Sequence, residues 1–444
     1  MDGVDEGVIS TTESLCPECL KRLPAQRVAQ GEKVYLVKRC TEHGEYRTLL
    51  WQGTPKWESW VRPTIPTPPK ERFTHVEKGC PFDCGLCADH YKTTCTALLE
   101  VTQRCNLNCR FCFANAGTEL DEPSLAVING WYKNVLAASG PVNIQLSGGE
   151  PTLRNDLPEI LAMGRTLGFN FIQLNTNGLR LAEDPQYLSQ LKEAGLSSVF
   201  LQFDGTEDPI YQAIRGRSLL DIKIKAIESC GNQEIGVVLV PTLIPGINTH
   251  NIGGIIQFAL ENHPVVRGVH FQPVSYFGRI PKEPTDLDRI TLPEVIQAIE
   301  EQTDGLIKAA NLKPHNGRCS FSGNFTRQSD GSLKPIVNSS CCAGPERADE
   351  LARKTRTFVA RQWSGTEKLT IQDPCSNSWD NLLQQLKTYA FSISGMAFQD
   401  VWNLDIDRLK NCCIHVVSPE GKLIPFCAYN LTDKFGHSIY RRGR

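Results

Sequence analysis

The residues best suited to chemistry in this sequence are three cysteines, Cys105, Cys109 and Cys112. They follow a strand-like apolar run at C-x3-C-x2-C spacing, with the aromatic Phe111 just before the last of them. Three thiolates can hold three corners of a four-iron cluster and leave the fourth iron open. An open metal position can bind a substrate or cosubstrate, whereas a closed one stores structure or electrons. The spacing therefore predicts a catalytic 4Fe-4S cluster with one open iron.

A glycine-rich loop, Ser-Gly-Gly-Glu-Pro at 147–151, follows a second strand-like apolar run. In this order, the cysteine triplet and this loop resemble the signature of the radical S-adenosylmethionine (SAM) enzymes. In that superfamily the open iron chelates the amino and carboxylate groups of the methionine part of SAM. The resemblance implies that Glu150 accepts from the methionine ammonium, with the backbone of Gly148 and Gly149 close by. It also implies that Phe111 packs near the adenine.

Polar residues at the ends of later strands are further candidates for contacts with SAM or the substrate. They are Asn175, Thr176, Asn177, Gln202 and Asp204. Each of them is also explained by an ordinary cap or turn. The stretch 206–216 resembles a segment after the fourth strand in peptide- and cofactor-modifying members of the superfamily. Arg215 in this stretch is a candidate for the SAM carboxylate or ribose, and a surface salt bridge is the alternative.

The elements that must position these residues alternate between short strands and amphipathic helices. Strands are expected at 98–102, 142–146, 171–175, 199–203, 236–241 and 269–273, and helices for example at 157–167, 185–194 and 221–229. Repeated strand–helix–strand units imply a parallel sheet with right-handed crossovers, and α/β barrels place their chemistry in the loops after the strands. The superfamily resemblance implies an α/β fold with a partial (β/α)6 barrel, and the number of strands agrees with it.

The same cysteine spacing occurs a second time, at Cys80, Cys84 and Cys87. Cys95 follows and offers a fourth thiolate, so this set can close its metal site. It does not follow a barrel strand, and we therefore assign it to an auxiliary 4Fe-4S cluster. A structural four-cysteine zinc site is the alternative, because zinc accepts similar ligand spacing.

Both ends of the chain carry further metal-binding patterns. Cys16-x2-Cys19 and Cys40-x2-His43 form two knuckles that suit zinc or a mononuclear iron ion. The C-terminal segment contains Cys319, Cys341, Cys342, Cys375, Cys412, Cys413 and Cys427. It also contains two hairpin-like turns, at 329–336 and 418–425.

This C-terminal arrangement resembles the auxiliary-cluster domains of a large branch of radical SAM enzymes. Neighbouring residues of a strand face opposite sides, so each Cys-Cys pair is expected to contribute one ligand. The resemblance therefore implies a second auxiliary cluster, with Cys319, Cys341, Cys412 and Cys427 as candidate ligands. The sequence does not decide which four cysteines bind it.

Four units follow from these patterns. Residues 1–70 are expected to form a zinc-ribbon or rubredoxin-like metal knuckle, 76–97 an auxiliary-cluster knuckle, 98–310 the barrel, and 311–444 a C-terminal auxiliary-cluster domain. The 18 cysteines of this 444-residue chain indicate metal ligation, because the chain is large and begins without a secretory signal. Only Cys230 stands alone, and we expect a buried apolar thiol there.

Composition limits the function classes. The net charge of −2 gives no electrostatic reason to expect nucleic-acid binding. No apolar run approaches the roughly 20 residues that span a bilayer, so we expect no transmembrane segment and a cytoplasmic, soluble protein. Peripheral contact with a membrane stays open. The basic residues 441–444 are expected to be a solvated end.

The combination of both knuckles with the C-terminal cysteines resembles a narrower group. It includes the archaeal tetraether lipid synthases and proteins once assigned as pterin methylases. This resemblance implies C–C bond formation, or methyl or alkyl transfer, at an unactivated carbon of a lipid or small molecule. An electron donor such as ferredoxin or flavodoxin would supply the reductant. The alternatives are a peptide-modifying radical SAM maturase and a non-catalytic iron–sulfur electron carrier.

Overall fold

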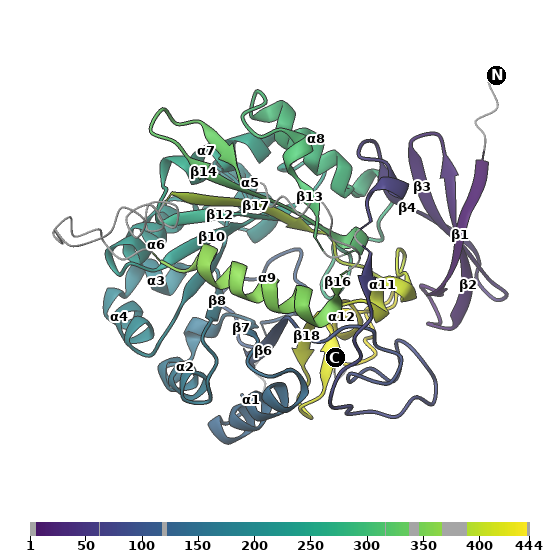
Figure 1. The fold of residues 1–444 in the computed structure, drawn as a ribbon, viewed down its shortest axis with the longest axis horizontal. Helices are drawn as coiled ribbons and strands as arrows, with labels where there is room; N and C mark the ends of the chain where they lie inside the picture. The colour runs from purple at the N-terminus through teal and green to yellow at the C-terminus, as the bar shows by residue number, and fades with distance from the viewer. Residues whose placement is uncertain are drawn as a thin grey trace.

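We analysed a computed structural model of the 444-residue chain (Figure 1). It describes residues 6–61, 63–117, 122–315, 317–336, 346–365 and 389–441. Cys341, Cys342 and Cys375 lie outside these ranges, so the candidate ligand Cys341 has no structural account here.

The six strands expected from the sequence form one parallel sheet. They are β6 (Thr96–Thr102), β7 (Asn143–Gly148), β8 (Ile172–Thr176), β9 (Ser198–Gln202), β10 (Gly236–Val240) and β12 (Val266–Pro273). Each pairs in parallel with the next one along the chain, so the strands run in chain order across the sheet. This arrangement confirms the α/β fold with a partial (β/α)6 barrel.

Alternate strand residues explain why helices cover one face of this sheet. The apolar positions that join the main core are Ala97, Leu99, Ile144, Leu146, Ile172, Leu174, Val199, Leu201, Val237 and Leu239. They pack against α1 (Leu125–Ser139), α2 (Leu157–Thr166), α4 (Pro185–Glu193), α6 (Leu220–Asn232) and α7 (Ile252–Glu261). Each fully buried Leu or Ile side chain contributes about 1.5–3 kcal/mol. The expected helices at 157–167, 185–194 and 221–229 are thereby confirmed.

The C-terminal segment extends the barrel sheet at both edges. Strand β17 (Ala390–Met396) pairs in parallel with β12, and β18 (Ile414–Val417) pairs in parallel with β6. The two hairpins expected from the turns are present, as β14 (Ser320–Arg327) with β15 (Leu333–Pro335) and β18 with β19 (Leu423–Pro425). Strands of the segment 311–444 therefore continue the sheet that carries the barrel.

Helix α9 (Ala348–Trp363) lies across the other, concave face of the sheet (Figure 1). The indole Nε1 of Trp363 donates to Ser392 Oγ on β17 at 3.0 Å, and Arg267 Nε on β12 donates to the Gln362 carbonyl at 3.0 Å. Gly236 begins β10 where a Cβ would lie 2.4 Å from the Trp363 carbonyl oxygen. The helix therefore covers the concave face near the beginnings of the strands.

The N-terminal residues form an antiparallel four-stranded meander. Its strands are β1 (Glu6–Leu15), β2 (Arg22–Gln30), β3 (Lys33–Cys40) and β4 (Gly44–Gln52). The meander docks on the C-terminal segment through the buried guanidinium of Arg27, which donates to both carboxylate oxygens of Asp405 at 2.9 Å. Lys38 Nζ donates to the Val401 carbonyl at 2.7 Å beside it.

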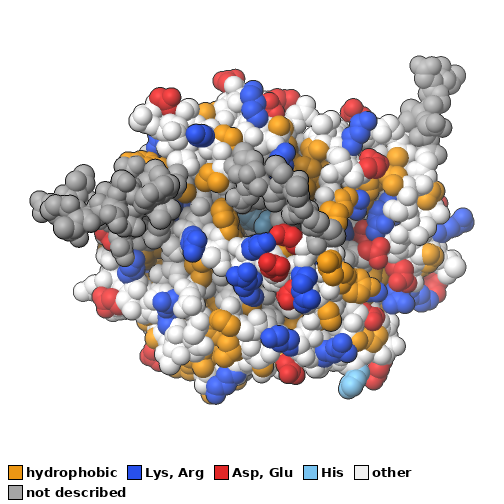
Figure 2. All heavy atoms as spheres, in the orientation of Figure 1, with side chains coloured by type: hydrophobic (Ala, Val, Ile, Leu, Met, Phe, Trp, Pro, Cys, Tyr) orange, Lys and Arg blue, Asp and Glu red, His pale blue; other side chains and the backbone are white. Residues whose placement is uncertain are grey.

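Shorter elements complete the described part of the chain. They are α3 (Leu179–Glu183), α5 (Asp208–Arg215), α8 (Leu292–Gln302), α11 (Ile406–Lys410), α12 (Phe426–Asn430), β5 (Thr64–Ile65), β11 (Thr242–Leu243), β13 (Lys313–Pro314) and β16 (Glu346–Arg347). On the face shown in Figure 2, basic and acidic side chains are interspersed. In the described ranges, no helix has the length and apolar character needed to cross a membrane.

The close approach of β12 and β17 generates a stability prediction. A Cβ at Gly268 would lie 2.1 Å from the Ser392 carbonyl oxygen, so Gly268→Ala must push the two strands apart. We expect the free energy of unfolding to fall by about 1–3 kcal/mol, measured as a lower urea midpoint. The matched control is Gly130→Ala in α1, where a Cβ meets nothing within 4 Å, and it should gain about 0.5–1 kcal/mol. An unchanged midpoint for Gly268→Ala would contradict this account.

Candidate active site and metal centres

The cysteine triplet lies in the loop that leaves the C-terminal end of β6. Cys105, Cys109 and Cys112 gather in one small apolar cluster with Leu107 and Leu179. Burial raises the pKa of Cys105 to about 12, and the nearby charges of Glu150, Cys109 and Cys112 add to this effect. Three neighbouring thiolates therefore need a cationic partner, and iron ions supply it. The donor set fits a three-cysteine 4Fe-4S cluster.

The glycine-rich loop pairs with the backbone just before Cys105. Gly149 N donates to the Thr102 carbonyl and Glu150 N to the Arg104 carbonyl, both at 2.8 Å. A Cβ at Gly148 would lie 2.1 Å from the Thr102 oxygen, and one at Gly149 the same distance from the Arg104 oxygen. Gly148 also has a φ of +120°. Only glycine fits these two positions, because the two backbones are in direct contact.

Glu150 ties this loop to the end of β8. Its Oε1 accepts from the hydroxyls of Thr152 at 2.6 Å and Thr176 at 2.7 Å, and its Oε2 accepts from Asn177 N at 2.7 Å. Asn177 in turn donates from Nδ2 to Asn106 Oδ1 at 2.8 Å, inside the cysteine loop. The candidate residues Glu150, Thr176 and Asn177 thus form one network with the cysteine loop. Their contacts with SAM remain predictions.

A second buried network lies at the end of β9. Arg215 Nε and Nη2 donate to the two carboxylate oxygens of Asp204 at 2.7 and 2.8 Å. The Gln202 amide oxygen, in the orientation that satisfies its neighbours, accepts from Arg215 Nη1 at 2.9 Å. Burial lowers the pKa of Arg215, but Asp204 and then Cys109 raise it and prevail. The ion pair is therefore buried beside the cysteine triplet rather than at the surface.

Phe111 borders a cavity of about 250 Å³ beside the cysteine loop. Its ring contacts Tyr276 edge-on at 6.3 Å between centroids, and Ile244 and Ile247 line the same cavity. Arg110, Lys282 and Asp288 line the cavity as well, and the adenine contact that the resemblance implies for Phe111 stays a prediction. Asn175 is the one strand-end candidate outside these networks, and its buried Oδ1 has no hydrogen-bond partner among the described residues.

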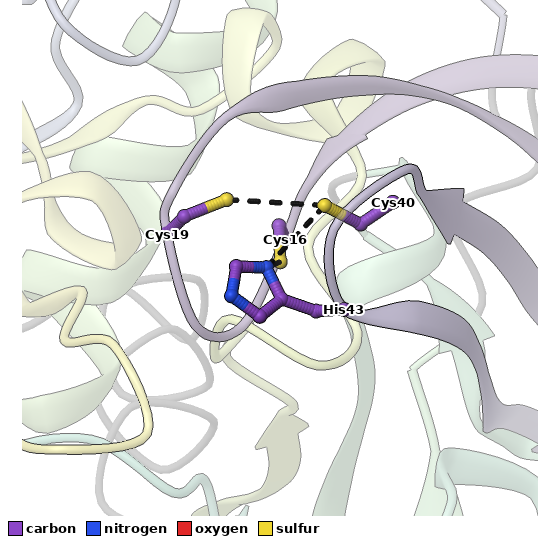
Figure 3. A group of neighbouring side chains, drawn as sticks. All are labelled: Cys16, Cys19, Cys40 and His43. Carbon is purple, nitrogen blue, oxygen red and sulfur yellow. Dashed lines mark hydrogen bonds between the residues drawn. The ribbon is translucent and has the colours of Figure 1, made fainter.

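The N-terminal knuckles meet at one end of the meander (Figure 3). His43 Nδ1 lies 3.5 Å from the sulfurs of both Cys16 and Cys40, and the sulfurs of Cys19 and Cys40 are 3.9 Å apart. All four donor atoms lie within 4.8 Å of one another. A tetrahedral zinc ion with Zn–S bonds of about 2.3 Å separates its sulfur ligands by about 3.8 Å. The four side chains therefore fit a single tetrahedral metal ion.

Comparison with known proteins identifies the family. The model of the radical SAM superfamily matches residues 99–259, and the model of the HMPTM N-terminal zinc ribbon domain matches residues 8–52. The 7,8-dihydro-6-hydroxymethylpterin dimethyltransferase of Methanocaldococcus jannaschii is 37% identical, over 94% of this chain and 93% of that protein. The chain belongs to the radical SAM superfamily.

More distant relatives share part of this radical SAM chain. The probable GTP 3′,8-cyclase of Archaeoglobus fulgidus is 25% identical, over 60% of this chain and 94% of that protein. A solved structure of native anSMEcpe with bound AdoMet and a Cp18Cys peptide is 18% identical, over 47% of this chain and 58% of that chain, with a TM-score of 0.38. Radical SAM enzymes use a 4Fe-4S cluster and SAM, so this chain is an enzyme and not an electron carrier.

The second cysteine triplet of this radical SAM enzyme is also buried. A hydrogen bond with Cys80, together with burial, raises the pKa of the Cys84 thiol well above its ordinary value, and the charge of Cys87 adds to it. These three thiols thus lie together. The sequence spacing groups Cys95 with these three thiols as a fourth ligand, but in the structure Cys95 lies beside a different cysteine. Its Sγ lies 2.8 Å from Cys413 Sγ, because its backbone N–H donates to the Cys413 carbonyl at 2.7 Å where β6 meets β18.

Cys95 and Cys413 are part of a third thiol group at the C-terminal segment. Burial, followed by the charges of Cys427, Cys413 and Cys319, raises the pKa of Cys412 well above its ordinary value. The structure thus brings together Cys319, Cys412 and Cys427, three of the four candidate ligands. It adds Cys95 and Cys413, which were not candidates for this cluster. Cys413 was left out because alternation along a strand indicates only one ligand from each Cys-Cys pair.

Two basic residues at the active site were not expected from the sequence. Arg279 follows β12 and clamps the cysteine loop, since its backbone exchanges hydrogen bonds with Cys112 at 3.1 and 3.0 Å. Its Nη2 donates to the Ala116 carbonyl at 2.9 Å. Lys223 on α6 is fully buried and donates from Nζ to the Asn177 carbonyl at 2.5 Å. Gly278, in the loop after β12 and just before Arg279, is a usable signal in the sequence, whereas Lys223 resembles any lysine of an amphipathic helix.

The ribbon geometry predicts a selective loss of metal. Cys19→Ala removes one of four ligands, so the protein should lose about one zinc or iron ion per chain. Cys230→Ala is the matched control, because this buried thiol stands apart in α6 and should change no metal content. Elemental analysis of both variants measures the loss and identifies the ion. Equal metal contents in Cys19→Ala and wild type would contradict the assignment.

Proposed function

We propose that this enzyme transfers methyl groups to a C–H carbon of a small pterin-type heterocycle. The chain is 37% identical to a protein named for that activity, across nearly its whole length. The observation that carries the proposal is the chemistry of the concave face of the barrel sheet, on which the substrate would lie beneath the cysteine loop. Parallel barrels place their active sites at the carboxyl ends of the strands, where this face meets the cysteine loop, so the side chains there select the substrate class.

Amide side chains line this face on the first strands of the barrel. Gln145 Nε2 donates to Gln173 Oε1 at 2.8 Å, and Gln173 Nε2 donates to Ser198 Oγ at 3.3 Å. Asn175 lies two residues after Gln173 on β8, closer to the cysteine loop. Its buried Oδ1 has no hydrogen-bond partner among the described residues. On the far strand β14, Asn324 lies opposite Ser392 and its buried Oδ1 also has no partner among the described residues. The amide oxygens of Asn175 and Asn324 could therefore each accept a hydrogen bond from a substrate.

Aromatic rings complete the same face. Phe200 lies 5.4 Å from the His270 ring and 5.6 Å from the Trp363 ring, measured between centroids. His270 also bonds through Nδ1 to Ser394 Oγ at 2.9 Å. A flat heterocycle with ring N–H and amino groups satisfies the free acceptors and stacks on such rings. A long alkyl chain would bury these amides without partners, at a cost of about 1–3 kcal/mol each, so the face supports a pterin over a lipid.

In the proposed reaction the cluster, when bound, supplies one electron that cleaves SAM to methionine and a 5′-deoxyadenosyl radical, and the residues of the chain hold the cluster and SAM. Cys105, Cys109 and Cys112 would hold the cluster, and Glu150 would accept from the methionine ammonium. Gln202, Asp204 and Arg215 would contact SAM, with Arg215 at its carboxylate or ribose. A protein of the ferredoxin or flavodoxin class would supply the electron.

The atoms balance for each methylation. One hydrogen atom leaves the substrate carbon and ends in 5′-deoxyadenosine, and one methyl group takes its place. The methyl group would come from a second SAM, which leaves as S-adenosylhomocysteine. One external electron cleaves the first SAM, and a second is consumed when the substrate radical takes up the methyl cation. Helix α9 covers the concave face near the beginnings of the strands and would limit the access of water to the carbon radical from that side.

Two auxiliary clusters are part of the same proposal. Cys80, Cys84 and Cys87 would hold the first, and four of the five thiols Cys95, Cys319, Cys412, Cys413 and Cys427 the second. Two half-buried cations near these thiols support the second site. Arg356 donates to the Thr94 carbonyl at 3.3 Å and Arg408 to the Ala397 carbonyl at 3.1 Å, and neither forms a salt bridge with a carboxylate in the described ranges. An anionic iron–thiolate cluster would balance these charges.

The proposal predicts separable losses in cysteine variants. Reconstituted Cys105→Ala should form no 5′-deoxyadenosine, because the open cluster is lost. Cys84→Ala should lose about four irons, keep some abortive SAM cleavage and form no methylated product. Mass spectrometry of reactions with a reduced 6-hydroxymethylpterin, methyl-labelled SAM and labelled folate measures both products and names the methyl source. Methylated lipid or peptide in parallel extracts, with unmodified pterin, would overturn the substrate class. Normal turnover by Cys105→Ala would overturn the cluster assignment.

The free amide of Asn175 gives a substrate-specific prediction. Asn175→Leu keeps the size of the side chain but removes the acceptor, so the KM for the pterin should rise about tenfold. The KM for SAM should stay unchanged. Asn170→Leu, an exposed position before β8, is the matched control. A rise in the KM for SAM alone would assign Asn175 to SAM instead.

A further inference from the structure

The last described residues, Tyr440 and Arg441, lie between the two cysteine triplets. The sequence indicated a solvated end here, and for Arg441 that expectation is wrong. Its side chain is only 13% exposed. The chain turns back through a short bridge between Thr432 and Ser438, which directs the following residues into the protein.

Tyr440 anchors this segment on the knuckle triplet. Its hydroxyl accepts from the backbone N–H of Cys84 at 2.8 Å and donates to the Pro81 carbonyl. Burial and the adjacent charge of Cys84 raise the pKa of Tyr440 far above its ordinary value, so the hydroxyl stays a donor. The knuckle therefore holds Tyr440, and with it the neighbouring Arg441, in one place.

Arg441 reaches the other way, toward the catalytic loop. Its Nη1 donates to Glu100 Oε2 at 2.9 Å, and its Nη2 contacts the second carboxylate oxygen. Asn430 Oδ1 accepts from Nη2 at 2.7 Å, and the Tyr429 ring lies 4.7 Å from the guanidinium carbon. Nη1 also lies 3.5 Å from the carbonyl oxygen of Ala114, two residues after Cys112.

The pair of Glu100 and Arg441 therefore lies directly against the loop that holds the catalytic triplet. Glu100 is on β6, which leads into Cys105, and it is only 6% exposed. Burial lowers the pKa of Arg441, but the charges of Glu100, Tyr429 and Cys112 raise it and prevail. The ion pair lies in a buried site of low dielectric, where the fields of its two groups act strongly on neighbouring groups.

We propose that the Glu100–Arg441 ion pair sets the reduction potential of the catalytic cluster, and that Tyr440 positions this pair relative to the knuckle. Both charged residues act through the cluster, so they are positioning residues. The inference rests on the cluster assignment in the proposed function, but not on its pterin substrate. A nearby cation stabilises the more negative reduced cluster and raises its potential, and a nearby carboxylate does the opposite.

Two charge-neutralising variants test this with opposite signs. Arg441→Met leaves an uncompensated carboxylate, so the midpoint potential of the catalytic cluster should shift downward. Glu100→Gln leaves an uncompensated guanidinium, so the potential should shift upward. Arg441→Lys should restore the wild-type value, and the double variant should return close to it. An EPR-monitored redox titration of the full-length reconstituted enzyme, without substrate, measures all four.

The sign of the shifts separates a tuning role from a structural one. Two variants that merely break the same ion pair would shift the potential in one direction, or leave it unchanged, and either result would overturn the proposal. Arg347→Met, at an exposed ion pair with Asp349, is the control and should show no shift. If Arg441→Met fails to bind iron, the upward shift of Glu100→Gln still decides the question. Because no substrate is present, a failure of the pterin proposal leaves this result intact.

Discussion

The active site depends on one backbone contact, between the glycine-rich loop and the residues before Cys105. Gly149 and Glu150 donate to carbonyls of Thr102 and Arg104, with no space for a Cβ at either glycine. This contact joins the ends of β6 and β7, and the Glu150 carboxylate carries it on to Asn177 at the end of β8. These hydrogen bonds connect the ends of three strands and hold the cysteine loop rigidly, because polar backbone groups beyond the strands are paired with the neighbouring loop.

Buried charge is the second constraint on this structure. Burying an ionised group is costly unless it is paired, so each buried cation should face an anion. Arg215 forms an ion pair with Asp204, and Arg441 forms one with Glu100. Arg356 and Arg408 instead lie near groups of thiols. At the catalytic triplet and at the C-terminal thiol group, thiols that could not ionise together in an apolar site lie near a guanidinium. Electrostatics thus supports metal–thiolate centres independently of cysteine spacing.

Local patterns in the sequence predicted the elements well and long-range pairing poorly. The six barrel strands, both C-terminal hairpins and the ribbon ligands follow from periodicity, turn residues and spacing. The partnership of Cys95 with Cys413 does not, because it spans 318 residues and depends on β18 adding to the edge of β6. Arg441 has the sequence context of a solvated tail, and only the contacts of Tyr440 with the knuckle bring it inside. Spacing rules assign ligands within a knuckle, but tertiary structure decides which knuckles share a site.

The C-terminal segment gives the barrel its chemical character. By adding strands to both edges it leaves one concave face, which α9 covers near the strand beginnings and the cysteine loop borders at the strand ends. Side chains on that face come from both the barrel and the added strands, as Asn175 and Asn324 show. An enzyme that makes a carbon radical must hold its substrate still and dry, and unpaired amides held by rigid strands can do both. The segment that carries the third thiol group therefore also borders the proposed substrate site, which would link an auxiliary cluster there to the shape of that site.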